Sequence, residues 1–152
     1  MSPAETALRA AGAADLALLL GFIRGLYTAE HIPFDEERAA RALGGLLEEP
    51  SLGWVWIVER RGEAAGYAVV TLGYSLEFGG RFALLDELFI AESHRGAGLG
   101  RQVLDRIAEG CRQRGLRAVR LEVERTNLGA RALYRKAGFE AHDRDLMTFW
   151  LE

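Results

Sequence analysis

The sequence has few of the residues that build disulfide frameworks and metal centres. Cys111 is the only cysteine among 152 residues, so the chain can form no internal disulfide and no thiolate metal cluster. The three histidines, His31, His94 and His142, are scattered without the spacing of metal ligands. We therefore expect no metal in the chemistry of this protein.

Long apolar runs and an excess of positive charge are also missing. No apolar stretch approaches the roughly 18 to 20 residues that span a bilayer, and Met1 to Glu5 lacks the basic and apolar regions of a signal peptide. The formal net charge of −3 argues against a nucleic-acid partner and mildly favours cationic small molecules. We expect a cytoplasmic protein that binds neither membrane nor nucleic acid.

The composition is that of an ordinary globular protein. Hydrophobic residues make up 49% of the chain and charged residues 27%, which is far from the disordered and fibrous classes. The length suits one compact domain, and the chain contains no internal repeat or linker. The sequence predicts a single domain over residues 1–152.

Hydrophobic periodicity predicts the secondary structure. Apolar residues recur at three- and four-residue spacing in four stretches, which predicts helices over 16–27, from Asp35 to before Pro50, 99–111 and 127–137. Asp35 is expected to cap the second helix. Strand-like composition or alternation marks 7–10, 54–60, 66–72, 82–90, 119–124 and 145–151. This order predicts a mixed α/β sheet.

A glycine-rich turn follows the strand at 82–90 and opens the third helix. Its sequence is Arg95-Gly96-Ala97-Gly98-Leu99-Gly100. Glycines let the backbone approach a ligand, and the helix N-terminus adds partial positive charge, so this turn suits a pyrophosphate. The dinucleotide fingerprint would require glycine where Arg101 stands, and the Gly-Lys-Ser/Thr of a P-loop is absent. A glycine-rich turn without a ligand remains the alternative.

Two segments carry a resemblance to a known family. The run from Leu88 to Gly100 and the later run from Asn127 to Phe139 resemble the GCN5-related N-acetyltransferases (GNAT) in motif, order and spacing. Within the family, Leu85 to Ile90 resembles the diamine (spermidine/spermine) acetyltransferase group and its bacterial relatives. The resemblance implies the GNAT fold, with a mixed sheet of about six to seven strands flanked by about four helices.

The resemblance also implies acetyl-CoA as cofactor and a set of residues that bind it. Backbone amides of the loop would hold the pyrophosphate, and the pantetheine arm would lie along the preceding strand like an added strand. A backbone donor near Ile90 would polarise the thioester carbonyl. The implied cofactor-binding residues are Leu88, Phe89, Ile90, Arg95, Gly96, Ala97, Gly98, Leu99, Gly100, Arg101, Asn127, Ala130, Arg131 and Tyr134.

Three residues are candidates for the proton transfers. Tyr134 matches the general acid of the family, and a phenol with a pKa near 10 stays protonated at neutral pH. Asp86 and Glu87 are alternative bases. Strand alternation places Asp86 with Leu88 and Ile90, and Glu87 on the opposite face unless a bulge intervenes. A solvated acidic pair is the simpler reading, and Glu122 is a weaker candidate.

The acceptor would be recognised by the first helices and a later loop. Tyr27, Glu30, His31 and Asp35 supply acids and aromatic rings near the first two helices, and Tyr74 begins a predicted loop that runs to Arg81. These residue types suit a cation. An ordinary solvated surface explains them equally well.

Together these features predict direct transfer of acetyl from acetyl-CoA to a primary amine of a small molecule, either polyamine- or diamine-like or amino-acid-like. Two alternatives are a protein or peptide N-acetyltransferase and an acetyl-CoA-binding module without catalysis. A homodimer is expected from the resemblance, with the apolar end Phe149-Trp150-Leu151 as a candidate interface.

Overall fold

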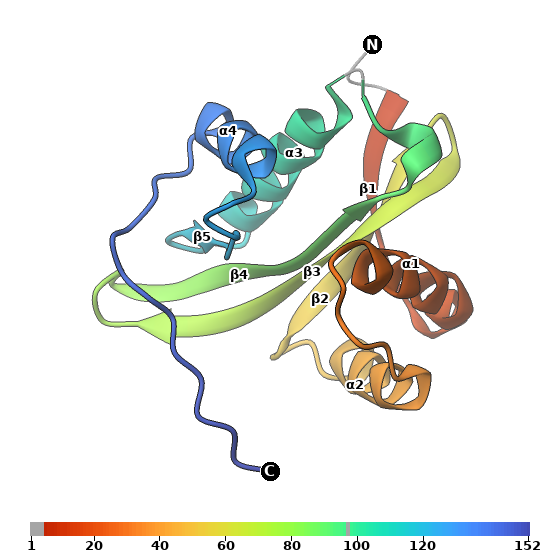
Figure 1. Cartoon of the computed structure of the whole chain (residues 1–152), viewed down its shortest axis with the longest axis horizontal. Coiled ribbons are helices and arrows are strands. Elements are labelled where there is room, and N and C mark those ends of the chain that lie inside the picture. Colours follow the sequence, from red (N-terminus) through yellow and green to blue (C-terminus); the bar gives the residue numbers. More distant parts are fainter. Residues whose placement is uncertain (1–4, 97) are drawn as a thin grey trace. The chain divides into compact units, whose positions relative to one another are not determined.

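The computed structural model describes residues 5–96 and 98–152. Their strands form one five-stranded sheet in the order β1-β2-β3-β4-β5 (Figure 1). The strands are β1 Thr6–Ala10, β2 Gly53–Arg60, β3 Glu63–Ser75, β4 Gly80–Ile90 and β5 Val119–Arg120. The first four pair antiparallel and β5 pairs parallel to β4, so the predicted mixed α/β sheet is confirmed.

Helices cover both faces of this sheet. Helices α1 Leu16–Ala29 and α2 Glu36–Glu48 lie on one face and α3 Leu99–Gln113 lies on the other (Figure 1). The Asp35 side chain accepts a hydrogen bond from the Arg38 backbone N–H at 3.1 Å, which confirms the predicted cap of α2. Among the described residues no helix combines the length and apolar character needed to cross a membrane.

Each face of the sheet has its own buried cluster. On the α1 and α2 side the cluster consists of Leu19, Ile23, Leu26, Leu43, Val55, Ile57, Tyr67 and Val69. On the other face α3 buries Leu99, Val103, Leu104, Ile107 and Cys111. The four-residue spacing of the α3 side chains is the pattern from which the helix was predicted.

The chain divides into two compact units. The first ends at Glu122 and holds the sheet and α1 to α3. The second is Val123–Glu152 and holds α4 Leu128–Ala137. Within α4, the Asn127 side chain accepts from the Ala130 backbone N–H at 3.1 Å, and Gly138 ends the helix with a φ of 106°.

Three sequence predictions differ from the structure. The strand predicted over 119–124 is limited to Val119–Arg120, and no strand forms over 145–151 among the described residues, which leaves five strands instead of six to seven. The predicted loop from Tyr74 to Arg81 is the end of a hairpin, because Tyr74 pairs with Arg81 in the β3–β4 ladder. Composition reports whether a segment suits a strand, but it does not identify the partner strand.

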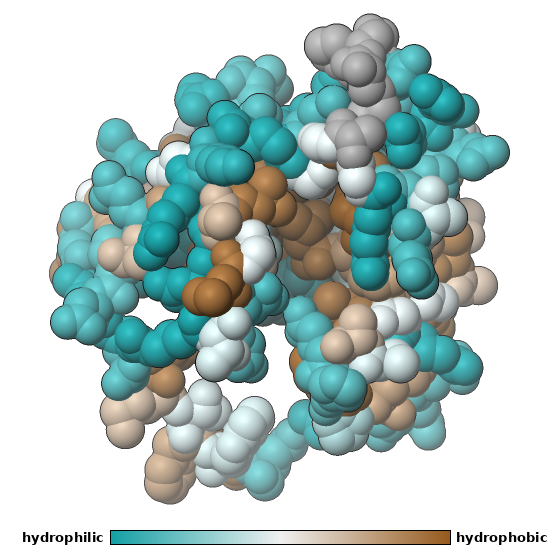
Figure 2. Space-filling model, turned by 45° about the horizontal axis from the view of Figure 1, so that its top comes forward, coloured by the Kyte–Doolittle hydropathy of each residue, from teal (hydrophilic) through white to brown (hydrophobic). Residues whose placement is uncertain are grey.

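The second unit exposes large apolar side chains. Leu146, Met147, Phe149, Trp150 and Leu151 are between 75% and 93% exposed. On the face shown in Figure 2, hydrophilic side chains cover most of the surface and hydrophobic ones reach it between them. Single exposed apolar residues are normal, whereas five within six positions are not.

Candidate active site

A β-bulge in β4 decides which acidic residue faces α1 and α2. Leu85 pairs with Val70 and Glu87 pairs with Val69, so Asp86 is the extra residue in the ladder. Val69 and Val70 are neighbours on β3 and point to opposite faces of the sheet. Because residues paired across strands share a face, the bulge brings Glu87 to the α1 and α2 face, where Val69 belongs to the core.

Two tyrosines hold the Glu87 carboxylate. The Tyr27 hydroxyl from α1 donates to Oε2 at 2.7 Å, and the Tyr67 hydroxyl from β3 donates to Oε1 at 2.7 Å. Both distances are those of charge-assisted O–H···O bonds. Since each carboxylate oxygen has its own phenol, the orientation of Glu87 is fixed from two sides.

The environment of Glu87 raises the pKa of its carboxyl group above the ordinary value. Burial raises the pKa of the Glu87 carboxyl, the two phenol hydrogen bonds lower it, and the negative charges of Asp86 and Glu30 raise it further, with a net upward shift. Burial and the bond to Glu87 also raise the pKa of Tyr27 and of Tyr67, so both phenols stay protonated at neutral pH. A half-buried carboxylate with a raised pKa is a better proton acceptor than an ordinary exposed one.

Asp86 lies in a different setting from its neighbour. Its side chain is exposed, and desolvation by its surroundings is the one cause that raises its pKa. Solvent screens the charge of an exposed carboxylate, which limits the effect of this desolvation. Of the two candidate bases, Glu87 is the one that specific side chains orient.

The remaining residues that were predicted to recognise the acceptor amine divide into two groups. Tyr27 contacts Glu87 directly, and Glu30 is exposed at the end of α1 within electrostatic range of Glu87. Asp35 is engaged as the cap of α2. Tyr74 is 71% exposed and stands five residues beyond Val69 on β3, roughly 17 Å along an extended strand from the residue opposite Glu87.

The glycine-rich turn has the backbone of an anion cradle. Gly96 and Gly98 adopt left-handed φ values of 93° and 76°, and an added Cβ at either position would meet no atom within 4 Å. Gly98 is the N-cap of α3 and has no side chain to cap the N–H groups of the first turn. The space and the donors therefore fit a pyrophosphate. Ala97 lies outside the described residues.

Arg95 ties this turn to the end of β4. Its Nε donates to the Ile90 carbonyl oxygen at 2.8 Å, and its guanidinium lies over the Phe89 ring at 5.6 Å from the centroid. At the other end of the turn Arg101 forms an exposed ion pair with Asp105 at 3.1 Å. Two cations thus flank the N-terminus of α3.

The outer edge of β4 is open beside this turn. The ladder between β4 and β5 includes only Ala83 with Val119 and Leu84 with Arg120. Among the described residues no strand pairs with that edge from Leu85 to Ile90. Unpaired backbone groups on a strand edge accept an extended chain as an added strand, and this suits Leu88, Phe89 and Ile90 to an extended pantetheine arm.

The second unit carries the other predicted site residues. Asn127 caps α4, and Ala130, Arg131 and Tyr134 lie within that helix. The Tyr134 ring packs edge-on against Phe139 at 5.8 Å between centroids. Spacings of four and three residues place Asn127, Arg131 and Tyr134 on one side of α4.

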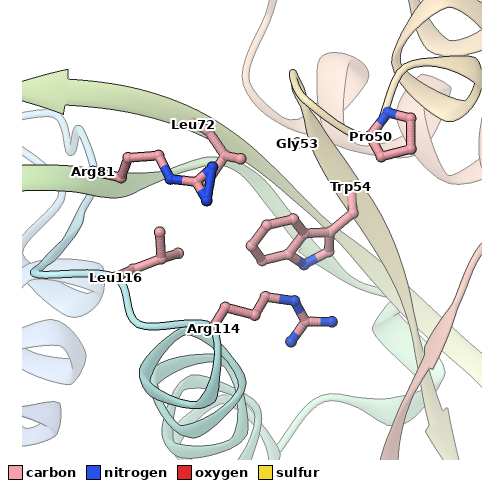
Figure 3. Close-up of a pocket in the computed structure, with 7 residues that line it drawn as sticks. All are labelled: Pro50, Gly53, Trp54, Leu72, Arg81, Arg114 and Leu116. Carbon is pink, nitrogen blue, oxygen red and sulfur yellow. The ribbon is translucent and has the colours of Figure 1, made fainter.

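A surface depression elsewhere in the first unit does not suit an amine. It has a volume of about 440 Å³ and lies where β2 begins, β3 ends and α3 ends (Figure 3). Its lining residues are Pro50, Gly53, Trp54, Leu72, Arg81, Arg114 and Leu116. The lining holds two cations and no carboxylate, and Arg81 stands roughly 30 Å along β4 from Ile90. This depression therefore differs in charge from the surroundings of Glu87 and lies apart from them.

Tyr67 is the residue of this site that the sequence does not reveal. It lies in a predicted apolar strand, where a tyrosine usually packs as part of the core. A buried phenol needs a hydrogen-bond partner, and that rule is the only signal available. Its partner depends on the pairing register of β3 and β4, which the residue pattern does not specify.

Comparison with known proteins agrees with the fold. The model of the acetyltransferase (GNAT) family matches residues 20–139, and the chain therefore belongs to this family of acetyltransferases, which use acetyl-CoA as donor.

Individual relatives are more distant. The chain is 40% identical over 55 residues to the Bacillus subtilis protein named Uncharacterized N-acetyltransferase YobR, a match of 36% of this chain and 22% of the relative. The Methanocaldococcus jannaschii protein named Uncharacterized N-acetyltransferase MJ1207 is 33% identical over 69 residues, 45% of this chain and 30% of the relative. The chain thus matches less than a third of either relative's length.

A solved structure matches over nearly the whole chain. The integron cassette protein HFX_CASS3, from the mobile metagenome of Cole Harbour Salt Marsh, is 31% identical, with a TM-score of 0.84 over 99% of this chain and 92% of that one. A protein of Clostridium acetobutylicum described as a predicted acetyltransferase, solved with acetyl-CoA, is 22% identical, with a TM-score of 0.77 over 95% of this chain and 96% of that one. At that identity the second match is evidence for the fold alone.

Proposed function

We propose that this protein transfers the acetyl group of acetyl-CoA directly to a primary amine of a small cationic molecule. The observation that carries the proposal is the Glu87 carboxylate, held at 2.7 Å by both Tyr27 and Tyr67 on the strand that leads into the glycine-rich turn. A cationic amine is attracted to such a carboxylate, and a proton acceptor is what an ammonium group needs before it can attack an acyl carbon.

The donor would bind along β4 and at the start of α3. Backbone N–H groups from Arg95 to Gly100 would hold the pyrophosphate, and Leu88 to Ile90 would hold the pantetheine arm at the open strand edge. When bound, acetyl-CoA supplies an acyl group activated as a thioester. No side-chain nucleophile is required, because positioning the two reactants supplies much of the rate.

The protein's residues then divide the remaining work. Glu87 accepts the proton of the acceptor, while exposed Asp86 adds negative charge close to it. Tyr134 donates a proton to the departing sulfur, and Asn127, Ala130 and Arg131 contribute to cofactor binding from α4. These roles follow the family resemblance of the segments that carry them.

The charge around Glu87 favours a polyamine or diamine as acceptor. Asp86 and Glu30 both act electrostatically on Glu87, and the rings of Tyr27 and Phe34 meet edge-on at 5.9 Å beside it. Carboxylates and aromatic faces together attract alkylammonium groups. An amino-acid-like amine, a peptide amine, and binding of acetyl-CoA without transfer are the alternatives to be tested against it.

The test is release of free thiol from acetyl-CoA with a panel of polyamines, amino acids, aminoglycosides and short peptides. We expect diamines and polyamines to react fastest. Tyr134→Phe should lower turnover by about 100-fold, in the range of one general acid, with little change in acetyl-CoA affinity. Unchanged turnover would remove the role of Tyr134, and preferred reaction of peptides would move the acceptor class to proteins.

We also propose a homodimer that covers the apolar C-terminal end. Phe149 and Trp150 are 88% and 77% exposed, and aromatic side chains are enriched in protein interfaces. Light scattering on the native protein should give twice the mass of the chain, and the double variant Phe149→Ser, Trp150→Ser should give the mass of one chain. A monomeric native protein would contradict this proposal.

A further inference from the structure

We propose that Tyr67 is a positioning residue for Glu87 and that Tyr27 passes the acceptor's proton to Glu87. This inference rests on the proposed acetyl transfer at the same site. It starts from the fact that each carboxylate oxygen already accepts a phenol at 2.7 Å, so the two tyrosines occupy about half of the hydrogen-bond acceptor sites of Glu87.

The two tyrosines differ in their access to solvent. Tyr67 is 0% exposed, and its ring stacks on Phe22 and tilts against Phe89, each at 6.3 Å between centroids. Tyr27 is half-buried, with its ring edge-on to Phe34. Of these two phenols, Tyr27 is the one that can meet a molecule that arrives from solvent, so Tyr67 acts on the reaction through Glu87 alone.

The Tyr27 hydroxyl can accept a hydrogen bond while it donates one to Glu87. An ionised carboxylate has no proton to give, so the hydroxyl hydrogen of Tyr27 must point to Glu87. The phenol oxygen keeps its lone pairs, which can accept an N–H of an incoming ammonium group. Tyr27 can therefore lie between an amine substrate and Glu87. Its hydroxyl hydrogen points to Glu87, and its oxygen lone pairs can accept a hydrogen bond from the amine.

The proton balance is complete without a further reactant. The ammonium N–H bond breaks and its proton moves to the Tyr27 oxygen, while the Tyr27 O–H bond breaks and that proton moves to Glu87 Oε2. The amine is left neutral with a free electron pair, Tyr27 is neutral before and after, and Glu87 becomes a carboxylic acid that later returns the proton to solvent. Both shifts occur together, because an isolated Tyr27 phenolate is disfavoured by burial and by Glu87.

The charged groups around Glu87 explain why two phenols are needed. Asp86 on β4 and Glu30 at the end of α1 raise its pKa together with burial, and the phenols from α1 and β3 are the groups that lower it. Within the described residues Glu87 has no ion-pair partner. Losing either phenol removes a bond to the charged form, so the Glu87 pKa should rise by about one unit.

The experiment measures the Glu87 pKa directly and then the pH dependence of transfer. Carboxyl carbons of the ¹³C-glutamate-labelled protein are titrated by NMR without donor or acceptor, and Glu87 is assigned by its loss in Glu87→Gln. The pH profile of kcat/KM is then recorded with an amine that the native protein acetylates. The variants are Tyr67→Phe and Tyr27→Phe.

We expect both variants to move the Glu87 midpoint upward by about one pH unit. The acidic limb of the Tyr67→Phe profile should move with it, and the rate should recover to within about twofold of native at high pH. Tyr27→Phe should stay about tenfold or more below native at every pH, because it lacks the relay oxygen. Acetyl-CoA affinity should be unchanged in both.

Thr6→Val is the matched control for losing a buried hydroxyl. The Thr6 hydroxyl is 1% exposed and bonds Gln102 Oε1 at 2.8 Å, on α3 and away from Glu87. This control should lose stability without moving the Glu87 midpoint. Should Tyr67→Phe fail to fold, 3-fluorotyrosine at all four tyrosines gives the opposite sign, because the more acidic phenols are stronger donors and lower the midpoint.

An unmoved Glu87 midpoint in Tyr67→Phe, or in the fluorotyrosine protein, would overturn the positioning role. A Tyr27→Phe plateau within twofold of native would overturn the relay. If the native protein acetylates no amine but its Glu87 midpoint responds as described, the proposed function is contradicted. The positioning of Glu87 by the two tyrosines would still stand.

Discussion

The ionised form of Glu87 destabilises the folded state, because its carboxylate is half-buried. Its folded-state pKa is raised above the ordinary value of 4.5. Between 4.5 and the raised value the folded state binds the Glu87 proton more tightly than the unfolded state, so this residue's contribution to stability falls as pH rises through that window. At neutral pH an ionised Glu87 therefore lowers the free energy of unfolding.

Glu87→Gln tests this balance. The amide has the same shape, carries no charge, and can bond both phenols because a hydroxyl both donates and accepts. We expect the variant to be more stable than native at pH 7.5, and the difference to vanish at low pH, where native Glu87 is protonated. Urea denaturation at both pH values measures it, and a variant less stable than native at pH 7.5 would contradict it.

Single residues also show where sequence reasoning stops. The sequence identifies Asp86 and Glu87 as a pair, but simple alternation groups Asp86 with Leu88 and Ile90. The bulge at Asp86 puts Glu87 on the opposite face from Leu85, whereas Glu87 still alternates with Leu88 and shares its face with Phe89. Tyr67 could not be assigned, since its partner is identified only once the pairing register of β3 and β4 is known.

At the scale of elements, the turn into α3 depends on glycine. Gly98 has a φ of 76°, and Gly62 in the β2–β3 turn has a φ of 77°. At both positions an added Cβ would meet no atom within 4 Å. The same left-handed strain, about 1 to 2 kcal/mol, therefore applies to alanine at both positions. The two glycines differ in that only Gly98 caps α3.

Gly98→Ala and its matched control Gly62→Ala separate strain from binding. We expect similar losses of stability, and a rise of about tenfold in the acetyl-CoA dissociation constant for Gly98→Ala alone, because its methyl group projects where the pyrophosphate would lie. Calorimetric titration with acetyl-CoA measures both proteins. Equal affinities would remove the pyrophosphate from this turn.

The elements differ in how well the sequence predicts them. Helices α1 to α4 repeat their apolar residues at helical spacing, and their caps at Asp35 and Asn127 are local, so both were predictable. Strands depend on partners distant in sequence. This is why β5 is shorter than its alternating pattern suggests and why 145–151 has strand composition without a strand.

At the scale of the whole molecule, the first unit contains Glu87, its tyrosines and the glycine-rich turn. The second unit contains Tyr134 and has no buried residue in α4. The expectation that both belong to one domain over 1–152 stays a prediction. It agrees with the small size of Val123–Glu152, since segments below about 40 residues rarely fold alone without disulfides or metals.

The most direct test of the central claim is the acetylated amine itself. Native protein, acetyl-CoA and the best amine of the panel are incubated and the product is identified by mass spectrometry, with Glu87→Gln compared at equal acetyl-CoA occupancy. The account predicts one added acetyl group on a primary amine, formed about 100-fold more slowly by Glu87→Gln. A Glu87→Gln rate equal to native, or no acetylated amine from native protein that binds acetyl-CoA, would contradict it.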